Sequence, residues 1–337
     1  MLRIEAARPE DYRAALDVLL QDLETPLREQ QIADMLAAAA RGDVSLHGLL
    51  LAHADERPIG AVLFVLQPDG CGFVWPPVVA AGIDAGLAET AADELLRAVG
   101  RRLDESQAWL GQALLDPENE RDARRMQRNG FEFLADLTYL RRRLDRAWPV
   151  DEGETSLRVE PVDPEVDSDR LAAVIERTYA GSADCPQLNG LRNGLEAVAG
   201  HRLTGVPLPD GWLVFRDHSG DPGGMRRRGP IHSGDPGGMR RRGPIQGGDV
   251  GVLLLADQPE QNAWELVYMG VVPEARGRGY GRAIVAEAIR RAANSSRRDL
   301  LLAVDERNRY AETIYEAAGF EFLDRKRVFA RRPGQST

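Results

Sequence analysis

Two short peptides recur in the same order along this chain of 337 residues. LRIE at Leu2 returns as LRVE at Leu157, and GFEFL at Gly130 returns unchanged at Gly319. Each copy of GFEFL closes a segment with the same succession of strand-like and helix-like patterns, so the sequence predicts one fold used twice. The length agrees, because it suits two domains of ordinary size.

The second half is longer because it contains a tandem duplication. The peptide HSGDPGGMRRRGPI begins at His218 and is repeated unchanged from His232. Glycine, proline and arginine dominate it without apolar periodicity, so we expect a disordered loop over residues 218–248. Strand-like runs flank this segment, which indicates an expanded hairpin turn.

A polar segment broken by Pro149 separates the halves and predicts a linker over residues 147–156, between a first domain at 1–146 and a second at 157–337. In both halves, strand-like runs and amphipathic helices predict a mixed α/β (α+β) fold, with a mostly antiparallel central sheet flanked by helices. The elements expected in the second half are strands at 157–162, 212–217, 250–256, 264–272, 299–305 and 320–330, and helices at 167–179, 189–203, 279–293 and 308–318.

Composition excludes several classes of protein. Forty-three basic and 53 acidic side chains give a net charge of −10, which argues against broad binding to nucleic-acid backbones. No apolar run approaches the roughly 18 residues of a membrane span. Cys71 and Cys185 form no C-x-x-C pair, so neither a zinc site nor a disulfide framework is expected. The charged N-terminus lacks signal-peptide character, so we expect a cytoplasmic protein. We also expect a monomer or homodimer that binds no metal and has no nucleic-acid or membrane partner.

A glycine-rich turn lies between a β-branched run and an amphipathic helix in ELVYMGVVPEARGRGYGRAIVAEAIRRA. Glycines let the backbone turn sharply, and the free amides of a helix start attract an anion such as a pyrophosphate. Arg276, Arg278 and Arg282 add local positive charge, although a solvated helix start would also accommodate them. The pattern is neither a P-loop nor a dinucleotide-binding fingerprint.

Two motifs carry a resemblance to a known family. The pattern V-V-P-x-x-R-x-x-G-x-G at residues 271–281 resembles the acetyl-CoA signature of the GCN5-related N-acetyltransferases (GNATs). The pattern N-x-x-A-x-x-x-Y-x-x-x-G-F at 308–320 resembles the second motif of that family. The resemblance is strong over 157–331 and extends to the first half by topology and fragments. It implies tandem acyl-CoA N-acyltransferase (GNAT) folds, as in the mycothiol synthase-like members of the family.

The resemblance implies an acetyltransferase that uses acetyl-CoA as co-substrate and an amine of a small molecule or peptide as acceptor. The residues it implies for acetyl-CoA are Met269, Val271, Val272, Arg276, Gly277, Arg278, Gly279, Tyr280, Gly281, Arg282 and Asn308.

Acetyl transfer to an amine needs a base and an acid. A protonated amine must lose a proton before it attacks the thioester. By resemblance the candidate base is Glu265, because it lies eleven residues before Arg276, a spacing similar to that of the base in histone-type members of the family. A solvated strand carboxylate is the alternative for Glu265. By resemblance Tyr315 protonates the thiolate, whereas the alternative is a core tyrosine. Asn308 has two compatible roles, as a helix N-cap and as a pantetheine contact.

The first half lacks most of these groups. When the halves are aligned on their Val-Val pairs, Glu89 replaces Arg282, and Asp84 adds a second carboxylate that would repel a pyrophosphate. Gly72 stands at the place of Glu265 and Met126 at that of Tyr315. We therefore expect a degenerate, non-catalytic first domain. The alternative for the whole protein is a non-catalytic acyl-CoA sensor or scaffold.

Overall fold

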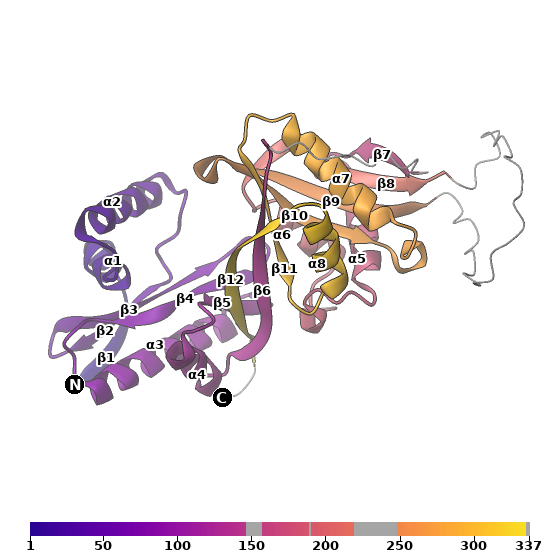
Figure 1. The fold of residues 1–337 in the computed structure, drawn as a ribbon. Coiled ribbons are helices and arrows are strands. Elements are labelled where there is room, and N and C mark those ends of the chain that lie inside the picture. Colours follow the sequence, from indigo (N-terminus) through magenta and orange to yellow (C-terminus); the bar gives the residue numbers. More distant parts are fainter. Residues whose placement is uncertain (146–156, 189, 219–247, 335–337) are drawn as a thin grey trace, which may run out of the picture. The chain divides into compact units, whose positions relative to one another are not determined.

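The computed structural model describes residues 1–145, 157–188, 190–218 and 248–334. The linker predicted at 147–156 and nearly all of the loop predicted at 218–248 lie outside these residues. The chain forms two compact units, and Figure 1 shows helices and strands in both. The first unit combines Met1–Thr138 with Asp324–Thr337, and the second comprises Tyr139–Leu323.

The first unit contains a sheet with helices on both faces. Alternate residues of one strand enter two separate cores, because side chains alternate across a strand. Leu49 and Leu51 lie in the core that contains Leu16 and Ile32 of the first two helices, whereas Leu50 lies with the third and fourth helices. The strands, in their order across the sheet, are β1 (Leu2–Ala6), β2 (Leu49–Ala54), β3 (Arg57–Leu66), β4 (Cys71–Val79), β5 (Leu110–Leu115) and β12 (Glu321–Arg331), and the helices are α1 (Tyr12–Leu19), α2 (Thr25–Arg41), α3 (Ala85–Glu105) and α4 (Glu120–Arg128).

The last strand of the chain belongs to the first unit. β12 pairs antiparallel with β5, and Phe329 lies opposite Ala113. The side chain of Phe329 is 1% exposed and lies in the α3 core. Nearby, the guanidinium of Arg331 donates two hydrogen bonds to Asp104, of 2.9 and 2.8 Å.

The strand β6 (Glu132–Arg143) makes the reciprocal contribution. It starts in the first half of the sequence, but Leu140 is buried in the core of the second unit. Arg142 donates to the carbonyl of Ala318 at 2.9 Å. The strands that begin within the two GFEFL copies are therefore exchanged, and the units do not coincide with the domains expected at 1–146 and 157–337.

In the second unit, the strand order is β6, β11, β10, β9, β8, β7. Neighbours from β7 to β10 are antiparallel, and β10 runs parallel to β11. The strands are β7 (Leu157–Pro161), β8 (Val206–Asp217), β9 (Asp249–Gln258), β10 (Ala263–Val271) and β11 (Asp299–Asp305), and the helices are α5 (Ser168–Tyr179), α6 (Gly194–His201), α7 (Tyr280–Ala293) and α8 (Arg309–Ala317).

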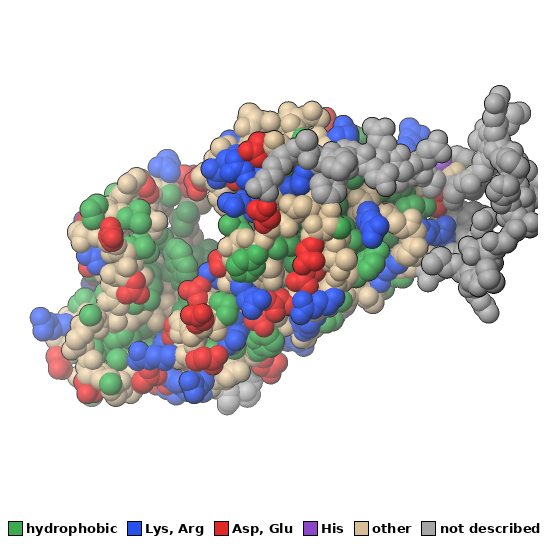
Figure 2. Space-filling model, viewed as in Figure 1, with side chains coloured by type: hydrophobic (Ala, Val, Ile, Leu, Met, Phe, Trp, Pro, Cys, Tyr) green, Lys and Arg blue, Asp and Glu red, His purple; other side chains and the backbone are tan. Residues whose placement is uncertain are grey.

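Most predicted elements of the second unit are confirmed within a few residues. The helix predicted from residue 189 begins at Gly194, because Asn193 and Glu196 form a reciprocal capping box there. Among the described residues, no helix is both long and apolar enough to cross a lipid bilayer. On the face shown in Figure 2, acidic and basic side chains are interspersed.

Candidate active site

A cavity opens where two parallel strands of the second unit separate. β10 and β11 pair only from Ala263 to Glu265, opposite residues 299–301. Beyond this point Met269 and Val271 of β10 and Val304 of β11 line a cavity of about 380 Å³, within the range of small-molecule sites. Past the paired residues, the edge of β10 that faces β11 offers backbone groups to an extended ligand.

The glycine-rich turn forms one end of this cavity. Gly277 and Gly279 have φ values of 76° and 82°, in the left-handed region that favours glycine. Gly279 is the N-cap of α7 and supplies no side-chain acceptor, so the first amides of the helix stay available for an anion. A Cβ atom on Gly281 would lie 3.1 Å from the side chain of Ile314, so glycine allows α7 to approach α8 closely.

Arg276 connects this turn to the end of α5. Its guanidinium donates to three carbonyls: Val271 at 3.0 Å, Gly181 at 3.0 Å and Thr178 at 2.8 Å. These bonds engage all three nitrogens of the group. Arg276 lines the cavity and fixes the shape of the turn, and its pairing with a pyrophosphate stays a prediction.

The other arginines and Val272 also differ in what they can contact. Arg278 lies 3.7 Å from the buried carboxylate of Asp217. Arg282 is exposed and forms no ion pair with any residue that the structure describes, so its charge is available to an anion. Val272 is buried, and its amide donates to the carbonyl of Val250 at 3.0 Å. Val272 does not line the cavity, and its contact with the cofactor stays a prediction.

The second motif supplies α8. Tyr315 lines the cavity and packs edge-on against Phe320, with ring centroids 5.7 Å apart. Burial, followed by the charge of Asp184, raises the pKa of the Tyr315 hydroxyl, which therefore stays protonated near neutral pH. Asn308 also lines the cavity, and its side chain accepts a hydrogen bond from the amide of Ala311 at 3.3 Å. The capping role of Asn308 is thus confirmed, whereas its contact with pantetheine stays a prediction.

Glu265 lies on β10 but does not line the cavity. On β9, the partner of Glu265 is Ala256 and the partner of Tyr268 is Leu254. These partners are two residues apart and so lie on one face of the sheet. A bulge before Tyr268 therefore places the side chains of Glu265 and Tyr268 on the same face. The half-buried carboxylate accepts a hydrogen bond of 2.5 Å from the side chain of Gln258. Burial raises the pKa of Glu265, and the Gln258 bond only partly opposes this effect. Glu265 is therefore not the solvated surface carboxylate of the alternative interpretation.

Sequence reasoning missed the wall formed by the end of α5 and the loop after it. The hydroxyls of Thr178 and Tyr268 lie 2.6 Å apart, and Tyr268 stacks on His201 with ring centroids 5.1 Å apart. A Cβ atom on Gly270 would lie only 2.6 Å from the Thr178 side chain, so glycine permits this close approach. Asp184 in the loop also lines the cavity. No motif marks these residues in the sequence, although Tyr268 lies within the ELVYMG run.

A larger cavity of about 520 Å³ lies elsewhere in the second unit. The segment after β7, the end of α6 and strand β8 line it, and His201 and Trp212 are among its residues. It contains no glycine-rich helix start that could bind a pyrophosphate. The smaller cavity between β10 and β11 is therefore the better candidate for an acyl-CoA.

In the first unit, α3 is the helix that corresponds to α7, and a carboxylate closes its start. Asp84 is the N-cap of α3 and accepts hydrogen bonds from the amides of Gly86 at 3.0 Å and Leu87 at 3.1 Å. At the start of α7 the corresponding N-cap is Gly279, which has no such side chain. The carboxylate of Asp84 thus uses the amides that an anionic ligand would need.

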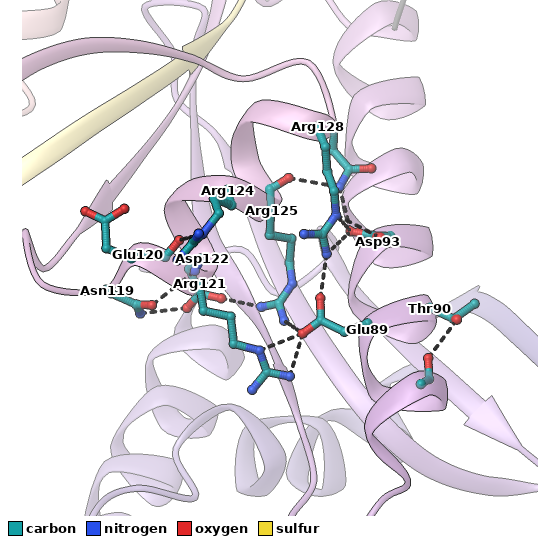
Figure 3. A network of polar contacts seen from close by, with 12 residues as sticks. Glu89, Thr90, Asp93, Asn119, Glu120, Arg121, Asp122, Arg124, Arg125 and Arg128 are labelled. Carbon is teal, nitrogen blue, oxygen red and sulfur yellow. Dashed lines mark hydrogen bonds and ion pairs between the residues drawn. The ribbon is translucent and has the colours of Figure 1, made fainter.

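Glu89, one turn further along α3, is held in a network of arginines from α4 (Figure 3). Arg121, Arg125 and Arg128 contact its carboxylate at 2.6, 3.0 and 2.5 Å. Desolvation opposes its ionisation, but the hydrogen bonds and charges of the arginines hold the pKa of Glu89 at about 2. A fixed negative charge therefore stands where the sequence alignment places Arg282.

Comparisons with known proteins agree with this geometry. Residues 246–320 match the family model described as "Acetyltransferase (GNAT) family". None of the curated proteins compared with the chain matches it. Among solved structures, a GCN5-related N-acetyltransferase from Sphaerobacter thermophilus aligns with 100% of this chain and 98% of its own, at 17% identity and a TM-score of 0.61.

Two further solved structures are similar. A tandem GNAT protein from the clavulanic acid biosynthesis pathway aligns over 100% of both chains, at 14% identity and a TM-score of 0.51. The glucosamine N-acetyltransferase region of a fungal multi-domain GH3 β-N-acetylglucosaminidase aligns with 98% of this chain and 38% of that chain, at 14% identity and a TM-score of 0.61. At these identities the likeness shows the fold.

The fold and the matched segment define an α/β protein of the acyl-CoA N-acyltransferase class. Residues 246–320 match the GNAT family model, and the predicted tandem GNAT fold is confirmed. The match supports an N-acetyltransferase activity in general, with acetyl-CoA as co-substrate.

Proposed function

We propose that the second unit transfers an acetyl group from acetyl-CoA to a primary amine of a small molecule or peptide. The cavity between β10 and β11, which ends at the uncapped start of α7, is the observation that carries this proposal. In the proposed complex, the pyrophosphate binds the amides after Gly277, with Arg282 nearby. The pantetheine arm extends along the open edge of β10 and past Asn308.

The proposed reaction is direct attack. Glu265, acting through a water because it does not line the cavity, takes a proton from the ammonium group of the acceptor. The free amine attacks the thioester carbonyl and forms a C–N bond, and an amide of residues 269–271 stabilises the oxyanion. When the C–S bond breaks, the nitrogen loses its second proton to solvent, and Tyr315 protonates the departing thiolate.

The pH dependence of CoA release with a panel of amines tests this proposal. We expect kcat/KM to fall as the pH is lowered through the pKa of Glu265, because the protonated carboxyl cannot accept a proton. Since burial raises that pKa, the midpoint should lie above the value of about 4.3 for an unperturbed glutamate. Glu265→Gln should remove this acidic limb and lower kcat/KM roughly tenfold at neutral pH, less than for a base in direct contact.

The exposed Glu260, in the short turn before β10, offers a matched control, and Glu260→Gln should keep the wild-type profile. An unchanged acidic limb in Glu265→Gln would exclude Glu265 as the base. Tight binding of acetyl-CoA without turnover of any amine would instead favour the sensor or scaffold.

We further propose that the first unit is non-catalytic and that each chain binds one acetyl-CoA. Equilibrium dialysis of the full chain should give one site, because Asp84 occupies the amides at the start of α3. Arg282→Glu should weaken that site, whereas Glu89→Gln should leave it unchanged. Two sites per chain would contradict the proposal.

A further inference from the structure

The loop that follows α5 is fixed against the cavity at several points. Arg276 donates to the carbonyl of Gly181, and the amide of Cys185 donates to Asp305 at 2.9 Å. Between these contacts, the carboxylate of Asp184 accepts a hydrogen bond of 3.2 Å from the amide of Asp305. Asp184 is exposed and lines the cavity, so a ligand can reach its carboxylate.

The two neighbouring carboxylates differ in how their charges are compensated. Asp305 is fully buried, and Arg307 donates to both of its oxygens, at 2.9 and 2.5 Å. Asp184 makes no ion pair with any described residue and accepts only the one backbone hydrogen bond. Desolvation raises the pKa of Asp184, and the charge of Asp305 raises it further. The charge of Arg307 opposes this rise, but Arg307 pairs with Asp305, so the cavity contains a carboxylate with no ion pair of its own among the described residues.

This carboxylate lines the cavity in which the proposed chemistry takes place. After burial, its charge is a further cause of the raised pKa of both Tyr315 and Tyr268. The shift of Tyr315 has no such contribution from Glu265. Asp184 and Tyr315 line the same cavity, and Asp184 is the only carboxylate among its described lining residues.

We propose that Asp184 binds the ammonium group of the acceptor and selects amines that arrive as cations. This inference rests on the proposed acetyltransferase function and adds its acceptor class. An incoming ammonium ion would supply a counter-ion, whereas a carboxylate next to the reacting amine would be repelled. Asp184 is a specificity residue here, because Glu265 remains the proposed base.

The test compares Asp184→Asn with the wild-type protein on three probes of similar size. These probes are a primary alkylamine, which is cationic at neutral pH, an aromatic amine, which is neutral there, and an uncharged alcohol. Asparagine keeps an oxygen that can accept the Asp305 amide, so the loop should keep its structure. We expect KM for the alkylamine to rise by about tenfold to a hundredfold, while KM for the aromatic amine and Kd for CoA stay unchanged.

Calorimetric binding of the same probes to the protein–CoA complex separates this inference from the proposed function. The inference is supported if the wild-type complex binds the alkylamine but not the alcohol, and if Asp184→Asn no longer binds the alkylamine. This result would hold even if no acetyl transfer occurs. Acetylation of both amines with the same preference in wild type and Asp184→Asn would overturn the inference and leave the function standing. Asp169→Asn, which removes an exposed carboxylate of α5, controls for the change in net charge.

Discussion

Replacing Tyr315 with phenylalanine is expected to lower kcat by about 10²- to 10⁴-fold, the usual contribution of a positioned acid or base. The hydroxyl is protonated near neutral pH and makes no hydrogen bond to any residue that the structure describes, so it is available to a ligand in the cavity. Without it, the thiolate of CoA must leave unprotonated or take a proton from water. Steady-state CoA release and the Kd for acetyl-CoA measure the two effects, and only kcat should change.

The structure offers a close control for this experiment. Tyr310 also lies on α8 and lines the same cavity, but its side chain is 65% exposed. Tyr310→Phe should keep nearly full activity. Phenylalanine at position 315 retains the edge-on contact with Phe320, so the melting temperature should change little. Wild-type kcat in Tyr315→Phe would eliminate Tyr315 as the acid and favour the core-tyrosine interpretation.

Local patterns in the sequence were sufficient to predict most of the second unit. The β-branched run, the glycine-rich turn and the amphipathic helix over 263–293 each constrain the backbone locally, and the structure confirms their order. The capping role of Asn308 was predictable for the same reason, because the cap and its Ala311 partner are only three residues apart. Most features that depend on neighbouring residues were therefore predicted correctly, with the start of the helix at Gly194 as an exception.

The partners and positions of the charged side chains in the site were not predictable in the same way. Sequence shows that Arg276 is positive, but its partners at Thr178 and Gly181 come from a segment almost a hundred residues away. Asp184 was missed because no sequence motif shows that a carboxylate lines a cavity without an ion pair to any described residue. Glu265 was predicted as the base by resemblance, yet only the structure shows that it lies outside the cavity.

The strand exchange was not predictable because the two copies are alike. Both β6 and β12 begin within a GFEFL peptide, so the same pattern of apolar residues would suit either unit. The choice depends on long-range contacts, such as the hydrogen bonds of Arg331 with Asp104. These contacts also allow the exchange to be tested by mutation.

Phe329→Ala is expected to destabilise the first unit by about 3–5 kcal/mol, the usual cost of removing a buried phenylalanine. The side chain is almost fully buried among residues of α3 and α4, so its loss leaves a cavity in that core. Hydrogen exchange measured peptide by peptide should therefore become faster in α3, while α7 keeps its protection. If β12 paired within its own half of the sequence, the pattern would be reversed.

Phe320, in the second GFEFL peptide, provides the matched control because it precedes the exchanged strand. It is buried in the core of the second unit, against Tyr315. Phe320→Ala should therefore accelerate exchange in α7 and α8 and leave α3 protected. Two phenylalanines nine residues apart would then affect different units, as the strand exchange requires. If Phe329→Ala instead accelerated hydrogen exchange in α7, β12 would stabilise the second unit.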